Sequence, residues 1–213
     1  MISAVCFDLD GTLTDPKPGI VRSMRYAMDR LGFASPLGDD LTWCIGPPLQ
    51  QSFDQLVGSD RAAKAVDYYR DRFSEIGWRE NERYPGITDV LQTLTDRGLP
   101  LYVATSKPAV FADQIIDHFE LRQFFTRVFG AELDGTRADK GLLLRHAVEE
   151  IGVGENAVMV GDRKHDIAGA RANQLKSIGV TYGYGSRDEL QDAGADKIVD
   201  KPEELLSAIP WPA

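Results

Sequence analysis

Short apolar segments of strand-like composition alternate with helical segments over most of this chain, and this alternation limits the folds that it can adopt. The first apolar run, Ala4 to Leu9, stops at the turn signal Asp10-Gly11-Thr12, as a buried parallel strand does. Similar patterns predict further strands at residues 99–104, 127–129, 157–161, 177–180 and 197–199, and helices at about 140–151, 166–172, 187–193 and 202–209. Strands that alternate with helices predict an α/β fold, in which a doubly wound parallel sheet is covered by helices on both faces.

One long segment interrupts the alternation and shows helical periodicity alone. Apolar residues at helical spacing predict three helices here, with buried stripes formed by Ile20, Met24, Ala27, Met28 and Leu31, by Leu49, Phe53, Leu56 and Val57, and by Val66, Tyr69, Phe73 and Ile76. The alternation resumes at the turn Tyr84-Pro85-Gly86, and Pro108 is expected in the first turn of a later helix. We therefore predict an α/β core of residues 1–15 and 84–213, with an all-helical domain of residues 16–83 inserted into it.

The charge and composition of the chain restrict its partners. The formal net charge is −9, which repels polyanions, so we expect no nucleic-acid partner and favour small solutes. No apolar stretch approaches the roughly 18 residues of a membrane span, and the first residues lack a basic leader, so we expect a cytoplasmic protein without a membrane partner. The sequence leaves open whether the protein is a monomer or a homodimer. Cys6 and Cys44 form no metal or disulfide framework, and we expect both to be buried and reduced.

Acidic residues stand at the carboxyl ends of two of the predicted strands. Asp8 and Asp10 lie at the end of the first strand, and Asp162 and Asp166 follow the strand at 157–161. Ligands of open parallel sheets bind outside the carboxyl ends of the strands, so these four side chains are expected to converge there. Such clustering would be strongly unfavourable without a cation, and a few carboxylates with room for water and phosphate suit Mg²⁺. The alternative is that Asp10-Gly11 is only a turn and that Asp166 only starts a helix.

The remaining strand ends supply groups suited to phosphoryl transfer. Of the paired carboxylates, one can attack phosphorus and the other can protonate the leaving oxygen and later activate water. Thr105 and Ser106 end the strand at 99–104 just before a helix, where hydroxyl and backbone N–H groups can hold phosphate oxygens. Lys140 opens another helix and can add a fixed positive charge, whereas taken alone it is more typical of a solvated lysine at a helix end.

Taken in order, these segments resemble the four motifs of the haloacid dehalogenase-like superfamily. They are Asp8-Leu9-Asp10-Gly11-Thr12, Thr105, Lys140, and Gly161-Asp162 followed by Asp166. The resemblance covers nearly the whole chain. It implies that Asp8 is the nucleophile, Asp10 the general acid and base, and Thr105 and Lys140 phosphate ligands. It also implies that Mg²⁺ is held by Asp8, the Asp10 backbone carbonyl and Asp162, with Asp166 supporting this metal shell.

The same resemblance implies the nature of the helical insert and the class of substrate. The insert resembles the family's mobile cap, and its loop Ile45-Gly46-Pro47-Pro48-Leu49 would face the substrate unless it is a plain turn between helices. The chain is most similar to the phosphoglycolate phosphatase and 5′-nucleotidase-like group, although Ser106 and Gly141 depart from its usual pattern. The predicted activity is hydrolysis of a small phosphorylated metabolite through an aspartyl-phosphate intermediate. A phosphomutase resembling β-phosphoglucomutase, and a non-enzymatic phosphoacceptor module, are the alternatives.

Overall fold

The computed structural model describes residues 2–33 and 40–209 and contains two compact units. The core unit is formed by residues 1–14 and 83–213, and the cap unit by residues 15–82. The chain passes between them in the short strands β2 (Thr14–Asp15) and β3 (Glu82–Arg83), which pair with each other in a small separate sheet. Because these two strands pair, the two ends of the insert lie side by side, and the insert begins a few residues after the first strand of the core.

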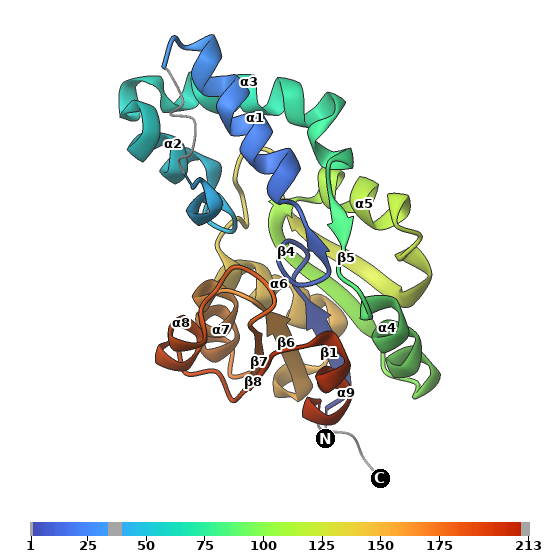
Figure 1. Ribbon diagram of the computed structural model, residues 1–213. Helices are drawn as coiled ribbons and strands as arrows, with labels where there is room; N and C mark the ends of the chain where they lie inside the picture. The colour runs from blue at the N-terminus through green and yellow to red at the C-terminus, as the bar shows by residue number, and fades with distance from the viewer. Residues whose placement is uncertain (1, 34–39, 210–213) are drawn as a thin grey trace. The chain divides into compact units, whose positions relative to one another are not determined.

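The core unit is built on a six-stranded sheet with the order β5-β4-β1-β6-β7-β8 (Figure 1). Every recorded pairing in it is parallel. The strands are β1 (Ala4–Phe7), β4 (Leu101–Pro108), β5 (Phe125–Ala131), β6 (Ala157–Gly161), β7 (Lys176–Val180) and β8 (Lys197–Val199). From β1 the chain first adds strands on one side and then, from β6 onward, on the other. The strand order therefore reverses between β1 and β6, which makes their carboxyl ends the expected ligand site.

Helices follow the strands of the core and cover the sheet. α6 packs against β4 and β5, and α7 against β6 and β7. One face of the sheet buries alternate residues such as Ala4 and Cys6 of β1 against Leu143 and Leu144 of α6. The core helices are α4 (Ile87–Asp96), α5 (Ala109–His118), α6 (Lys140–Ile151), α7 (Lys164–Ala172), α8 (Arg187–Asp192) and α9 (Leu205–Ala208), with short 3₁₀ turns η3 (Arg122–Phe124), η4 (Gly154–Asn156) and η5 (Pro202–Glu204). This is the doubly wound α/β fold that the alternation predicts.

The cap unit contains helices alone among its described residues outside the linking strands. α1 and α2 both pack against the longer α3, and Tyr69 of α3 contacts the rings of Phe53 and Phe73. The elements are α1 (Lys17–Arg30), η1 (Thr42–Cys44), α2 (Leu49–Val57), α3 (Ser59–Glu75) and η2 (Gly77–Arg79). Residues 34–39, between α1 and η1, lie outside the described residues. The three helices form on the three stripes that the sequence predicts.

The sequence prediction is wrong at Ile76 and at Pro108. Ile76 does not belong to the buried stripe of α3, because the helix ends at Glu75 and the backbone of Ile76 leaves the helical conformation, with φ −137°; its side chain is exposed. Pro108 does not sit in the first turn of α5. It is the last residue of β4, which continues four residues beyond the predicted end, and it precedes the helix as its N-cap.

Two expectations from composition can be compared with the structure. Cys6 and Cys44 are free thiols and both are buried, as expected. Within the described ranges, no helix combines the length and the apolar character that crossing a bilayer requires.

Candidate active site

The predicted site residues of the core lie at the carboxyl ends of β1, β4 and β6, where the strand order reverses. Asp8 directly follows β1, Thr105 lies near the end of β4, and Asp162 directly follows β6. Lys140 and Asp166 reach the same place from the first turns of α6 and α7. Residues that are far apart in the sequence therefore meet at one edge of the sheet.

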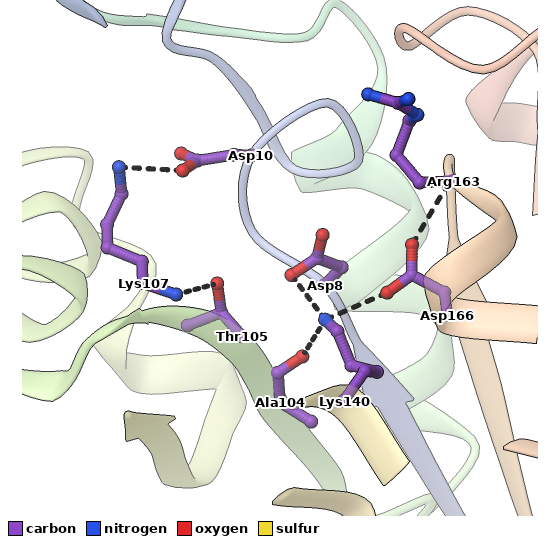
Figure 2. A network of polar contacts seen from close by, with 8 residues as sticks. All are labelled: Asp8, Asp10, Ala104, Thr105, Lys107, Lys140, Arg163 and Asp166. Atoms are coloured by element: carbon purple, nitrogen blue, oxygen red, sulfur yellow. Dashed lines mark hydrogen bonds and ion pairs between the residues drawn. The ribbon is translucent and has the colours of Figure 1, made fainter. Parts of the chain in front are cut away.

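Lys140 connects these elements through three contacts (Figure 2). Its Nζ lies 2.9 Å from Asp8 Oδ1, 2.8 Å from Asp166 Oδ1 and 2.9 Å from the carbonyl oxygen of Ala104. The contacts with Asp8 and Ala104 are hydrogen bonds, and the contact with Asp166 is an ion pair. The Lys140 side chain is buried, and it is therefore not a solvated lysine at a helix end. Burial alone would lower the pKa of Lys140, but the charges of Asp166 and Asp8 outweigh it and raise that pKa.

Asp166 caps the start of α7 and also belongs to the acidic cluster. Its Oδ2 accepts a hydrogen bond of 3.0 Å from the backbone N–H of Arg163, which completes a capping box, while Oδ1 faces Lys140. The structure thus places Asp166 both in the first turn of α7 and beside the carboxylates of Asp8 and Asp162. Burial raises the pKa of Asp166 to about 6, although the neighbouring Lys140 opposes the shift.

Asp162 is fully buried and keeps one carboxylate oxygen without a hydrogen-bond donor. Its Oδ2 accepts a 2.7 Å hydrogen bond from the backbone N–H of Tyr184, whereas Oδ1 has no partner in the described part of the chain. Burial, followed by the charges of Asp166 and Asp8, raises its pKa well above the ordinary value. Oxygens of Asp8, Asp162 and Asp166 all lie within 4.8 Å of one another, so these three carboxylates could hold a metal ion.

Glycines surround Asp162, and their role was not found from the sequence. A Cβ atom on Gly183 would lie 2.2 Å from the Gly11 carbonyl oxygen and 2.4 Å from Asp162 Cβ, and one on Gly185 only 1.9 Å from the Asp162 carbonyl oxygen. Gly11 has φ +83°, and a Cβ there would lie 2.2 Å from Asp162 Oδ2. Only glycine fits these approaches. The segment Gly183-Tyr184-Gly185 follows the predicted strand at 177–180. Its position after a strand of the sheet was the one feature of the sequence that could have indicated a role in the site.

Asp10 does not join the other three carboxylates, contrary to the expectation that four acidic side chains converge. β1 ends at Phe7 and the chain turns at Gly11, whose N–H bonds to the carbonyl oxygen of Thr14 at 2.8 Å. The Asp10 carboxylate instead contacts Lys107, with 2.6 Å between Oδ2 and Nζ (Figure 2). Burial raises the pKa of Asp10, and Lys107 opposes this shift. The sequence did not indicate this ion pair.

The predicted phosphate ligands Thr105 and Ser106 lie on the same edge of the sheet. Thr105 is buried, and its Oγ1 accepts a hydrogen bond of 3.2 Å from the backbone N–H of Lys107. Ser106 is partly exposed and lies three residues before α5 begins. Both residues thus precede the N-terminus of α5, and the free backbone N–H groups of a helix N-terminus can bind phosphate oxygens.

Comparisons with known proteins agree with this arrangement. A family model described as haloacid dehalogenase-like hydrolase matches residues 5–180. A 5′-nucleotidase of Pseudomonas aeruginosa is 50% identical over 190 residues, which cover 88% of this chain and 86% of that protein. A phosphoglycolate phosphatase of Neisseria meningitidis is 30% identical, with 98% of this chain and 91% of that protein covered.

Two further similarities come from a solved structure and from a protein with a different name. A crystal structure of a predicted phosphatase from Clostridium acetobutylicum superimposes with a TM-score of 0.94, at 43% identity and with 98% of each chain covered. The tyrosine-protein kinase PtkA of Mycobacterium tuberculosis is 40% identical over 86% of this chain, which spans 64% of that protein's length. The family model covers most of the chain, and the relatives named as phosphatases align over nearly all of it. The chain therefore belongs to the haloacid dehalogenase-like hydrolase family, among its phosphatases.

Proposed function

We propose that this protein is a Mg²⁺-dependent phosphatase that hydrolyses a small phosphorylated metabolite through a phosphoryl group carried on Asp8. The observation that supports this most is the placement of Asp8. Its carboxylate is fixed by Lys140 beside two further buried carboxylates, at the point of the sheet where strand order reverses. A carboxylate held in this way is restricted to a narrow set of orientations, as a nucleophile has to be.

The charge balance of the cluster supports a divalent cation. Asp8, Asp162 and Asp166 bring three carboxylates together, and Lys140 forms ion pairs with two of them, Asp8 and Asp166. Uncompensated buried carboxylates are costly, and Asp162 Oδ1 still lacks a donor. All the available ligands are oxygens, which suits Mg²⁺. When bound, Mg²⁺ would be held by Asp8, Asp162 and the Asp10 carbonyl oxygen, with Asp166 in support, and it would offset charge on the phosphate oxygens.

The residues of the site can catalyse two successive displacements at phosphorus, each with a distinct role for Asp8 and Asp10. In the first, a carboxylate oxygen of Asp8 forms a bond to phosphorus as the bond to the leaving oxygen breaks, and Asp10 donates a proton to that oxygen. In the second, Asp10 takes a proton from water, the water oxygen bonds to phosphorus, and the Asp8–phosphorus bond breaks to release inorganic phosphate. Thr105, Ser106 and the N–H groups that open α5 bind the phosphate oxygens. Lys140 orients Asp8 and supplies positive charge.

The substrate class that we propose is a small phosphate monoester, with nucleoside 5′-monophosphates as the first candidates. The 5′-nucleotidase relative supports this choice by its high identity and coverage, and the phosphoglycolate phosphatases support a second candidate. The cap unit is proposed to select the substrate through the loop Ile45-Gly46-Pro47-Pro48-Leu49, where Gly46 has φ +104°. The cytoplasmic location stays a prediction from the sequence.

A panel of substrates tests this proposal. Nucleoside 5′-monophosphates, phosphoglycolate, sugar phosphates, phosphotyrosine and a peptide containing it are incubated with Mg²⁺, with chelator, and with the variant Asp8→Asn. We expect many turnovers per chain on a small ester, none with chelator and none in the variant, because an amide is a poor nucleophile. Phosphoryl transfer to a second sugar hydroxyl would favour a mutase, and a single turnover would favour a phosphoacceptor module. Undiminished activity of Asp8→Asn would refute the proposal.

A further inference from the structure

The ion pair between Lys107 and Asp10 goes beyond the four motifs on which the proposed function depends. The 2.6 Å contact joins two side chains that are only 6% and 14% exposed, so water screens it little. The second oxygen of Asp10, Oδ1, is buried and has no hydrogen-bond partner in the described residues. The orientation of the Asp10 carboxylate therefore depends heavily on Lys107.

A local irregularity of β4 directs Lys107 toward Asp10. Thr105 pairs with Gly130 of β5, and the next pairing joins Pro108 to the following residue, Ala131. Ser106 and Lys107 are thus extra residues in a bulge, and a bulge changes the direction in which side chains leave a strand. The hydrogen bond from the Lys107 N–H to Thr105 Oγ1 closes this bulge at 3.2 Å (Figure 2).

The neighbouring strand is shaped to accept the bulge. A Cβ atom on Gly130 would lie 2.6 Å from Ala109 Cα and 2.9 Å from the carbonyl oxygen of Lys107. Both of these are backbone atoms that cannot move aside cheaply. The absence of a side chain at Gly130 therefore allows the backbone that carries Lys107 to lie where it does.

We infer that Lys107 is a positioning residue that holds the Asp10 carboxylate in the place from which it delivers a proton to the leaving group. This inference rests on the proposed function, in which Asp10 is the general acid. Lys107 does not itself exchange a proton with the substrate; it fixes the direction of the Asp10 side chain through a charge-assisted contact. The alternative role for Lys107 is that of a direct phosphate ligand. A positioning residue affects mainly esters with poor leaving groups, whereas a phosphate ligand affects esters with good and poor leaving groups alike.

The test compares esters with good and poor leaving groups. Expulsion of p-nitrophenolate needs no proton, whereas an alkoxide such as the 5′-oxygen of a nucleoside does. We expect Lys107→Met to lower kcat/KM about 100-fold for a nucleoside monophosphate and less than about 3-fold for p-nitrophenyl phosphate, since general acid catalysis contributes about 10²- to 10⁴-fold. The inhibition constant of inorganic phosphate should be the same for Lys107→Met as for the wild type. Lys107→Arg, which retains the charge, should recover most of the lost activity.

Two further variants complete the design. In an Asp10→Asn background, Lys107→Met should cost less than about 3-fold, because the two residues act as a unit. Lys176→Met removes an exposed lysine that is paired with Asp196 at 2.9 Å, and it should leave both substrates unaffected. An equal loss on both esters together with weaker phosphate inhibition would overturn the inference and make Lys107 a phosphate ligand. The proposed function would survive that result, since it is tested separately by Asp8→Asn.

Discussion

At Asp162, hydrogen bonding and close packing together decide which carboxylate oxygen remains available to a cation. The backbone N–H of Tyr184 donates a hydrogen bond to Oδ2, and the glycines on either side of Tyr184 allow its nitrogen to lie 2.7 Å from that oxygen. Oδ1 is left without a donor in the described residues, next to Asp8 and Asp166. Loss of a partner that orients a metal ligand typically lowers metal affinity about 10- to 100-fold. The segment that holds Asp162 should therefore tune Mg²⁺ binding without touching the ion.

The variant Gly183→Ala tests this at the scale of one residue. Its Cβ would lie 2.2 Å from the Gly11 carbonyl oxygen, so either the loop or Asp162 has to move. We expect Mg²⁺ affinity to fall about 10- to 100-fold, measured from the rise in Tm with Mg²⁺ concentration. Gly98→Ala is the control: it strains a backbone with φ +78° by about 1 kcal/mol but meets no atom within 4 Å, so Mg²⁺ affinity should stay unchanged. Equal affinities in Gly183→Ala and wild type would contradict this account.

Single residues also mark the limit of what the sequence could predict about the site. Asp8, Asp162, Asp166 and Lys140 were identified from their positions after strands or at helix starts, and the structure brings all four together. The contact of Lys107 with Asp10 could not be predicted, because it depends on the bulge that Gly130 of another strand permits. Local patterns identify the end of a strand, whereas the direction of a side chain there depends on its neighbours in space.

Among the secondary-structure elements, α6 has the most direct connection to the site, because Lys140 is its first residue. The side chain of Asp139 caps this helix by accepting a hydrogen bond of 2.9 Å from the N–H of Leu142. Such a cap satisfies one of the free N–H groups of the first turn and fixes where the helix begins. The start of α6 in turn fixes the point from which Lys140 reaches Asp8.

We expect Asp139→Ala to lower the free energy of unfolding by about 1 kcal/mol, because it removes the cap. Denaturant titration measures this change. The matched control is Asp139→Asn, whose side-chain oxygen can still accept the hydrogen bond, and it should lose only a few tenths of a kcal/mol, about the least that a cap substitution costs. If Asn and Ala destabilised the protein equally, the charge at this position would matter and the cap would not.

The elements also show why boundaries were harder to predict than the elements themselves. Apolar runs and helical stripes indicated every strand of the large sheet and the larger helices, since burial imposes those patterns. The end of β4 was placed four residues too early, because the polar residues of the bulge do not look like a strand. The exposure of Ile76 was missed because the apolar pattern continues for one residue after the backbone has left the helix.

For the whole molecule, the acidic cluster links stability, pH and metal binding. Burial raises the pKa of Asp166 from 3.8 to about 6, and the pKa of Asp162 is raised as well. Without metal, the folded protein therefore holds protons that the unfolded chain has already released between about pH 4 and pH 6. Stability from these groups is present at the acidic end of that window and is lost as pH rises through the folded pKa.

Mg²⁺ should reverse that loss, because it neutralises the same carboxylates once their protons have left. We expect the Mg²⁺-induced increase in Tm to be small near about pH 5 and to grow toward about pH 7, as the proton on Asp166 ceases to compete. Thermal unfolding with and without Mg²⁺ at several pH values measures it. The variant Asp166→Asn should flatten the pH dependence. An increase in Tm that is larger at the acidic end would contradict the assignment of these carboxylates.

The central claim is that Asp8 carries the phosphoryl group during turnover, and trapping this acyl phosphate tests it most directly. The protein is mixed with substrate and Mg²⁺, quenched in acid and treated with borohydride, which reduces an acyl phosphate to an alcohol, and its peptides are sequenced by mass spectrometry. The account predicts homoserine in place of Asp8, dependent on both substrate and Mg²⁺. Modification at a different residue, or unmodified Asp8 in an enzyme shown to turn over under the same conditions, would contradict it.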